Sequence, residues 1–162
     1  MPALVTRRAP GAPPLLPSVI RRLAEDMLRA LDLEKAELSV LLTNDRQIHA
    51  LNRQHREKDR PTDVLAFPLA DDGATPGDWL GDVVISLETA QRQADSRRRP
   101  LLEEVRFLLA HGLLHLIGYD HDTRPHKREM DAMARKLVRS AAIEATPRRR
   151  SVRKSGSRRR PS

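Results

Sequence analysis

The sequence predicts a single α/β (α+β) domain in which a small mixed four-stranded sheet packs with about five helices. Three observations support this fold class. Short aliphatic runs alternate along the chain with longer segments whose apolar residues recur at helical spacing. The length of 162 residues is that of one ordinary domain with one core. The chain has no cysteine, so its stability cannot depend on a disulfide framework.

The expected elements follow one another with short connections. In chain order they are a weak strand at 3–8, a helix at about 18–31, a strand at 37–43, a helix at about 44–54, strands at 64–68 and 80–87, and helices at about 86–98, 101–117 and 126–145.

Local signals justify the elements of the N-terminal half. The first strand (ALVTRR) is followed by the Pro/Gly-rich connector GAPPLLP. Ser18 is suited to cap the first helix, in which apolar residues recur every three or four positions from Val19 to Leu31. The aliphatic run ELSVLLT is typical of a strand, and Asn44 or Asp45 is suited to begin the next helix.

The C-terminal half repeats this alternation. The runs VLAFP and LGDVVISL predict two strands, separated by a loop that contains DDGATPGD. Ser86 or Thr89 is expected to open a polar helix. The next helix (LLEEVRFLLAHGLLHLI) is strongly apolar, and the last one begins near His126.

The segment HGLLHLIGYDH contains the most informative residues of the chain. It places His111, His115 and His121 at the spacing H-x-x-x-H-x-x-x-x-x-H. On a helix the first two lie about 6 Å apart along the axis and leave from one face. Gly118 can adopt a left-handed conformation that turns the chain back, so that His121 approaches from a loop. Three imidazoles would leave a fourth tetrahedral position for water, as in a catalytic zinc site.

A single histidine on an apolar helix is more often a core or surface residue than a metal ligand. Three histidines at this spacing reverse that expectation, because neutral histidines in a core would each need a separate hydrogen-bond partner. We therefore expect one Zn²⁺ per chain, at the C-terminal end of a helix. His49 and His55 fit surface positions of the second helix, and His126 lies at the surface or behind the ligands.

The same spacing matches that of the metzincin peptidases, with one departure. In that motif the glutamate after the first histidine acts as the general base. Here Gly112 occupies this position, and glycine cannot accept a proton. A peptidase is therefore only an alternative.

The string HGLLHLIGYDH also resembles the signature of the YbeY family of bacterial endoribonucleases. The segment LNRQHREKDRPTDVLAFP (51–68) looks like a second block of that family, with Arg56 in the place of its functional arginine, and LGDVVIS (80–86) looks like a third. The similarity runs in order from about residue 37 to 122. Glu57 and Ala66 depart from the family pattern, which has glycine and serine more often at these positions.

The resemblance implies hydrolysis of single-stranded RNA during small-subunit rRNA 3′-end maturation and ribosome quality control. It implies zinc on His111, His115 and His121, with His111 and Arg56 as the catalytic residues. An arginine suits a phosphate because its guanidinium binds two oxygens at once. Asp120 and Asp122 flank the third histidine, and either is placed to orient an imidazole. Without the resemblance, Arg56 would be interpreted as a surface arginine. Asp63 fits a turn or capping role equally well. No residue can be assigned as the general base.

The net charge of +8 is unevenly distributed. Residues 146–162 contain eight basic residues and no acid, and without those eight the remaining basic residues equal the 22 acidic ones. We expect a domain at 1–145 and a disordered basic tail at 146–162 that binds a polyanion or only improves solubility. No apolar run is long enough to span a membrane, and no targeting segment is apparent, so we expect a cytoplasmic protein without a membrane partner.

Three hypotheses follow. The first is a zinc-dependent endoribonuclease that binds RNA, rRNA and the small ribosomal subunit. The second is a metal-binding ribosome-assembly factor with little catalysis, and the third is a peptidase with an unrecognised base. With one Trp, one Tyr and two Phe in the chain, recognition of bases by aromatic stacking should be weak.

Overall fold

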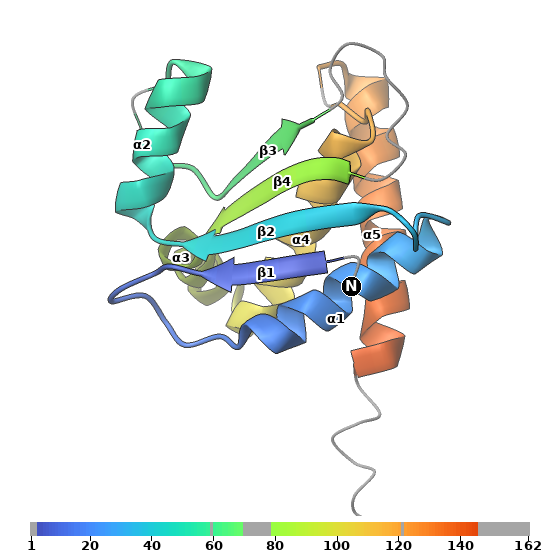
Figure 1. Ribbon diagram of the computed structural model, residues 1–162, viewed down its shortest axis with the longest axis horizontal. Coiled ribbons are helices and arrows are strands. Elements are labelled where there is room, and N and C mark those ends of the chain that lie inside the picture. The colour runs from blue at the N-terminus through green and yellow to red at the C-terminus, as the bar shows by residue number, and fades with distance from the viewer. Residues whose placement is uncertain (1–2, 59, 70–78, 121, 146–162) are drawn as a thin grey trace, which may run out of the picture.

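We describe the protein from a computed structural model, which defines residues 3–58, 60–69, 79–120 and 122–145. The expected four-stranded mixed sheet with five helices is confirmed for these residues (Figure 1). The elements are β1 (Ala3–Arg7), α1 (Pro17–Ala30), β2 (Glu37–Thr43), α2 (Asp45–Arg56), β3 (Val64–Pro68), β4 (Trp79–Ser86), α3 (Leu87–Arg97), α4 (Leu101–Leu116) and α5 (Arg124–Ala145).

The sheet has the strand order β1-β2-β4-β3. Strands β1, β2 and β4 are parallel, whereas β3 pairs with β4 in the antiparallel direction and forms an edge. Leu38, Val40 and Leu42 alternate on β2 and are fully buried on the face that packs in the main core. Helices α1, α4 and α5 contribute to that core, because their apolar stripes need a common surface to cover.

Helix α2 belongs to the other face of the sheet. Its Ile48 packs with Leu65 of β3 and Val84 of β4 in a second, smaller cluster. Figure 1 shows α2 set apart from α1, α4 and α5. The edge strand β3 thus has α4 on one side and α2 on the other, and this arrangement creates the groove described below.

Most expected element bounds are confirmed within one or two residues, with a few corrections. Ser18 does not cap the first helix, which begins at Pro17 after Leu16; proline suits this first position, because its φ is fixed and no N–H is needed there. Helix α2 runs two residues further than expected and ends at Arg56. Helix α5 begins at Arg124, two residues before the expected start.

Three further expectations concern the cap of α3, residues 146–162 and membrane-spanning segments. Ser86 caps α3 as expected, accepting a hydrogen bond from the backbone N–H of Thr89. The expected disorder of 146–162 lies outside the described residues. In the described part of the chain, no helix combines the length and apolar character that crossing a bilayer requires.

Candidate functional site

Helix α4 places two of the predicted histidines on one face. His111 and His115 are half-buried, while the neighbouring Leu109, Leu113 and Leu114 are fully buried in the main core. The buried residues fix the helix, so the histidines one turn apart face the same groove. The predicted i, i+4 pair is therefore formed by the structure.

Gly112, between the histidines, lies against the sheet. A Cβ atom at this position would come within 2.6 Å of Cγ1 of Val83 and 3.3 Å of Cγ2 of Val64. Glycine thus allows α4 to approach β4 and β3 more closely than any other residue would. The same contact explains why the glutamate of the metzincin motif has no counterpart here: its position is occupied by the sheet.

The contacts of His111 identify the roles of its two ring nitrogens. Its Nδ1 lies 2.9 Å from the carbonyl oxygen of Phe107, which can only accept, so Nδ1 carries the proton. Nε2, on the far side of the ring, is the nitrogen through which such a histidine usually binds a metal. Nε2 lies 3.4 Å from Oδ1 of Asp131 on α5. This donor set fits a divalent cation.

Asp131 is ionised beside this nitrogen. The hydrogen bond from Lys127, 3.1 Å from its Oδ2, and the neighbouring His111 hold the pKa of Asp131 below its ordinary value, against a smaller opposing effect of burial. A carboxylate at this place would stabilise a cation bound nearby.

Helix α4 ends in a tight turn at Gly118. Gly118 has φ of 106°, as predicted. The N–H groups of Gly118 and Tyr119 bond to the carbonyls of His115 and Leu114 at 3.2 and 3.0 Å, which is a Schellman ending. His121, the third predicted ligand, lies outside the described residues. Within those residues no group of three metal-binding side chains is present, so the ligand set stays a prediction.

Arg56 lies on the opposite wall of the groove, as the last residue of α2. Its guanidinium Nη2 donates a 2.8 Å hydrogen bond to the carbonyl of Ala66 on β3. Glu57 follows in a left-handed conformation (φ 58°) and ends the helix. Asn52 donates from its side chain to the carbonyl of Arg60 at 2.9 Å and fastens the next loop. Arg56 and the two histidines, far apart in sequence, thus line one cavity of about 440 Å³.

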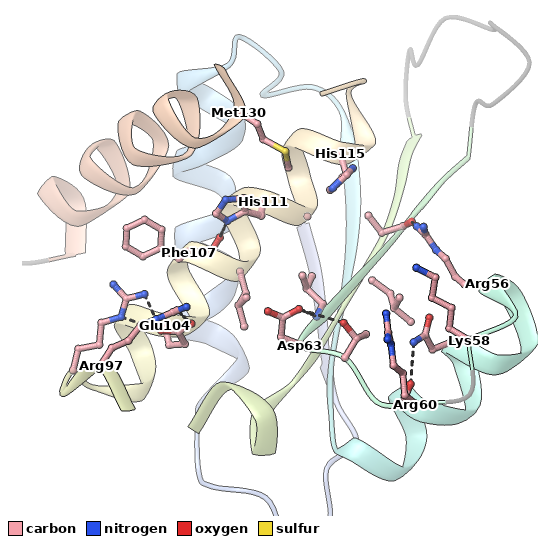
Figure 2. Close-up of a pocket in the computed structure, with 18 residues that line it drawn as sticks. Arg56, Lys58, Arg60, Asp63, Arg97, Glu104, Phe107, His111, His115 and Met130 are labelled. Carbon is pink, nitrogen blue, oxygen red and sulfur yellow. Dashed lines mark hydrogen bonds and ion pairs between the residues drawn. The ribbon is translucent and has the colours of Figure 1, made fainter. Parts of the chain in front are cut away.

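The groove is basic. Among the described residues that line it, five are cationic and two are acidic: Arg56, Lys58, Arg60, Arg97 and Arg99, with Asp63 and Glu104. Figure 2 shows His111 and His115 between Arg56 on one side and the Arg97 and Glu104 pair on the other. The excess of positive charge suits a polyanionic ligand.

The arginine wall of the groove was not predicted from the sequence. Glu104 is buried, with 1% of its side chain exposed, and its carboxylate accepts hydrogen bonds from Arg97 at 2.6 Å and from Arg99 at 2.9 Å. The guanidinium of Arg99 also lies 4.6 Å from the ring centre of Phe107, whose carbonyl holds His111. The only sequence signal was the run Arg97 to Arg99, which by itself resembles any charged turn.

The acidic and histidine candidates have mixed outcomes. Asp63 takes the local role, because its Oδ1 accepts from the backbone N–H of Val64 at 2.7 Å, although it also lines the groove. Asp122 accepts from Nδ1 of His126 at 2.7 Å. That hydrogen bond and the negative charge of Asp122 raise the pKa of His126. His126 is exposed, as expected.

His49 and His55 lie on α2, outside the groove. His55 is exposed, and its ring contacts Phe67 edge to face, with 5.2 Å between the ring centres.

Comparison with known proteins gives a consistent result. The family model described as Endoribonuclease YbeY matches residues 14–142. Proteins named Endoribonuclease YbeY from Anaeromyxobacter sp. (strain Fw109-5) and Heliobacterium modesticaldum are 48% and 41% identical to the chain over 124 and 122 residues, respectively. These matches cover 76% and 69% of the chain, and 64% and 74% of the relatives. The chain thus spans slightly less than two thirds of the Anaeromyxobacter protein.

A solved structure shares the fold. The solution structure of a protein from Thermotoga maritima aligns with a TM-score of 0.64 at 24% identity, covering 96% of this chain and 99% of the other.

Proposed function

The chain belongs to the YbeY family, and from that premise we propose that it is a metal-dependent endoribonuclease acting on single-stranded RNA. The observation that carries this proposal is the convergence of Arg56, His111 and His115 on one basic groove. Each lies within a block that resembles the family, yet the helices that hold them are separated by two strands and α3. Their meeting supports a common chemical role.

We propose that His111, His115 and His121 hold one zinc ion. Neutral imidazole suits Zn²⁺, and the Nδ1 bond of His111 to Phe107 leaves Nε2 for the metal. When bound, such an ion lowers the pKa of a water molecule toward neutrality and polarises a phosphoryl oxygen. Chemistry of this kind would not require a glutamate at the position of Gly112.

Arg56 has the role of binding and orienting the phosphate. Its bond to the Ala66 carbonyl holds the guanidinium at the groove wall while leaving further N–H donors for phosphate oxygens. Two parallel hydrogen bonds from a guanidinium would orient the phosphate and offset the charge that develops on it during hydrolysis.

We place the activity, as the family resemblance implies, in small-subunit rRNA 3′-end maturation and ribosome quality control in the cytoplasm. We also propose that the eight basic residues of 146–162 add electrostatic contacts to the RNA backbone. Such contacts position a nucleic acid without reading its bases.

The experiment that tests the proposal measures cleavage of a labelled single-stranded RNA by zinc-loaded protein. We expect cleavage by the parent protein and by His55→Ala, a matched control on an exposed histidine. Cleavage by His111→Ala should be slower on the order of a thousandfold or more. An assembly factor would bind the RNA without cleaving it. A peptidase would cleave casein but not RNA. Either result would refute the endoribonuclease.

A further inference from the structure

The groove extends beyond the histidines to a second cationic site, formed by Arg97 and Arg99. We infer that these two arginines bind a backbone phosphate of the RNA at a distance from the bond that is cleaved. This inference rests on the proposed function, since it assumes that a single RNA strand occupies the groove. It concerns Arg97, the last residue of α3, and Arg99 on the α3–α4 connection, both outside the histidine and Arg56 blocks.

Glu104 organises the arginine pair before any ligand binds. One buried carboxylate faces two guanidiniums, so the cluster keeps one net positive charge. Each guanidinium has five N–H donors, and Glu104 engages only part of each fork. Arg97 also has 56% of its side chain exposed, so a ligand can reach it from the groove. A guanidinium held in place loses less conformational entropy on binding than a free one.

The position of the pair sets the register of the strand. Glu104 and His111 are seven residues apart on α4, which is two turns and about 10 Å along the axis. A stacked strand advances about 3.4 Å per nucleotide, so this distance corresponds to about three nucleotides. Phe107 lies between the two sites, contacting Arg99 with its ring and His111 with its carbonyl. The second site would thus hold the RNA about three nucleotides from the metal.

A purely structural role is the competing explanation. In that case the arginines only neutralise Glu104 and fix the connection between α3 and α4. This explanation predicts a loss of stability on substitution but no change in the number of phosphate contacts. The two roles can therefore be separated by the salt dependence of RNA binding, which counts the phosphates that the protein neutralises.

The test compares Arg97→Gln with Arg98→Gln. Arg98 is an exposed arginine on the same connection and does not line the groove, and Arg97→Gln leaves Glu104 paired with Arg99. Binding of a ten-nucleotide single-stranded RNA to zinc-loaded protein is measured by stopped-flow fluorescence anisotropy across a salt series, before the RNA is cleaved. Thermal unfolding of each variant is measured in parallel.

We expect Arg97→Gln to weaken binding about fivefold and to reduce the slope of log K against log salt by about 0.7. The double variant Arg97→Gln/Arg99→Gln should reduce it by about 1.4. Arg98→Gln should change neither quantity.

The possible failures are distinguishable. Equal slopes for the parent and Arg97→Gln, with a reduced slope for Arg56→Gln, would refute the second site and leave the proposed function standing. Equal effects of Arg97→Gln and Arg98→Gln would show diffuse charge attraction and would also refute it. If the parent protein binds no single-stranded RNA, the proposed function fails and the second site fails with it.

Discussion

The two walls of the groove hold their functional side chains in different ways. On the α4 wall, His111 is a short side chain on a helix whose neighbouring Leu113 is fully buried, so the backbone sets its position. On the α2 wall, Arg56 is a long, exposed side chain whose tip is held by one hydrogen bond to Ala66. Metal binding requires donors fixed within tenths of an ångström, whereas phosphate binding tolerates a longer arm anchored at its end.

The largest expected effect is on the α4 wall. His111→Ala should remove the bound zinc and slow RNA cleavage on the order of a thousandfold or more, because several kcal/mol of transition-state stabilisation depend on the ion. Elemental analysis and single-turnover cleavage measure the two effects. His115→Ala should behave in the same way. Full zinc occupancy in both variants would show that α4 is not the metal wall.

The next largest effect is expected on the α2 wall, where a substitution should impair cleavage without affecting metal binding by the α4 wall. Arg56→Lys should slow cleavage about thirty- to thousandfold, the effect of losing about 2 to 4 kcal/mol in the transition state. Zinc content should stay unchanged, because Arg56 is proposed to bind the phosphate and is not one of the proposed metal ligands. Unchanged turnover would identify Arg56 as an ordinary surface arginine; a loss of zinc would show that the two walls act as one unit.

Gly112→Ala tests whether close packing fixes the α4 wall. The added Cβ would meet Val83, so we expect a loss of about 1 to 3 kcal/mol in the free energy of unfolding. Urea unfolding measures it. In a Val83→Ala background, which removes the two Cγ atoms in contact, the same substitution should cost less. Equal costs in both backgrounds would mean that packing against Val83 does not fix this wall.

Asp45 anchors the α2 wall at the end opposite Arg56. Its carboxylate accepts from Ser86 and Thr89, each at 2.6 Å, and from Arg92 at 2.8 Å, which ties α2 to β4 and α3. Burial alone would raise the pKa of Asp45, but these hydrogen bonds and the charge of Arg92 outweigh it and lower the pKa. The charged form is therefore the one that stabilises the fold.

Asp45→Asn should lower the free energy of unfolding by about 1 to 2 kcal/mol at neutral pH. Because the folded pKa is lowered, the advantage of the parent is complete above the ordinary value of 3.8 and is lost as the pH falls through the folded value. The stability difference should therefore shrink in acid. A difference that is independent of pH would contradict the assignment of the charged form.

The smallest expected effect lies outside both walls. Deletion of 146–162 should leave folding, zinc content and turnover at saturating RNA unchanged. It should flatten the salt dependence of RNA affinity, since even four phosphate contacts give a slope near −3, about −0.7 for each. If the full-length and truncated proteins have the same slope, residues 146–162 do not bind RNA and only improve solubility. Loss of zinc on truncation would show that the domain extends beyond residue 145.

The sequence by itself determined the features that depend on neighbours in the chain. Strands 37–43 and 64–68 have the predicted bounds, and His111 and His115 share a helix face because helical geometry fixes residues four apart. The left-handed Gly118 follows from the conformational freedom of glycine. These properties are local, so periodicity and residue type are enough to predict them.

Only the tertiary structure decided which distant residues meet. In the sequence, Gly112 is notable only because it replaces the general base of the metzincin motif. The structure shows that Gly112 packs closely against Val83, a contact that no local pattern encodes. The burial of Glu104 between Arg97 and Arg99, and the bond of Arg56 to Ala66, depend on how helices pack against the edge strand. Charged residues in loops carry no periodic signal, because their partners are chosen by the packing of the core and not by their neighbours in the chain.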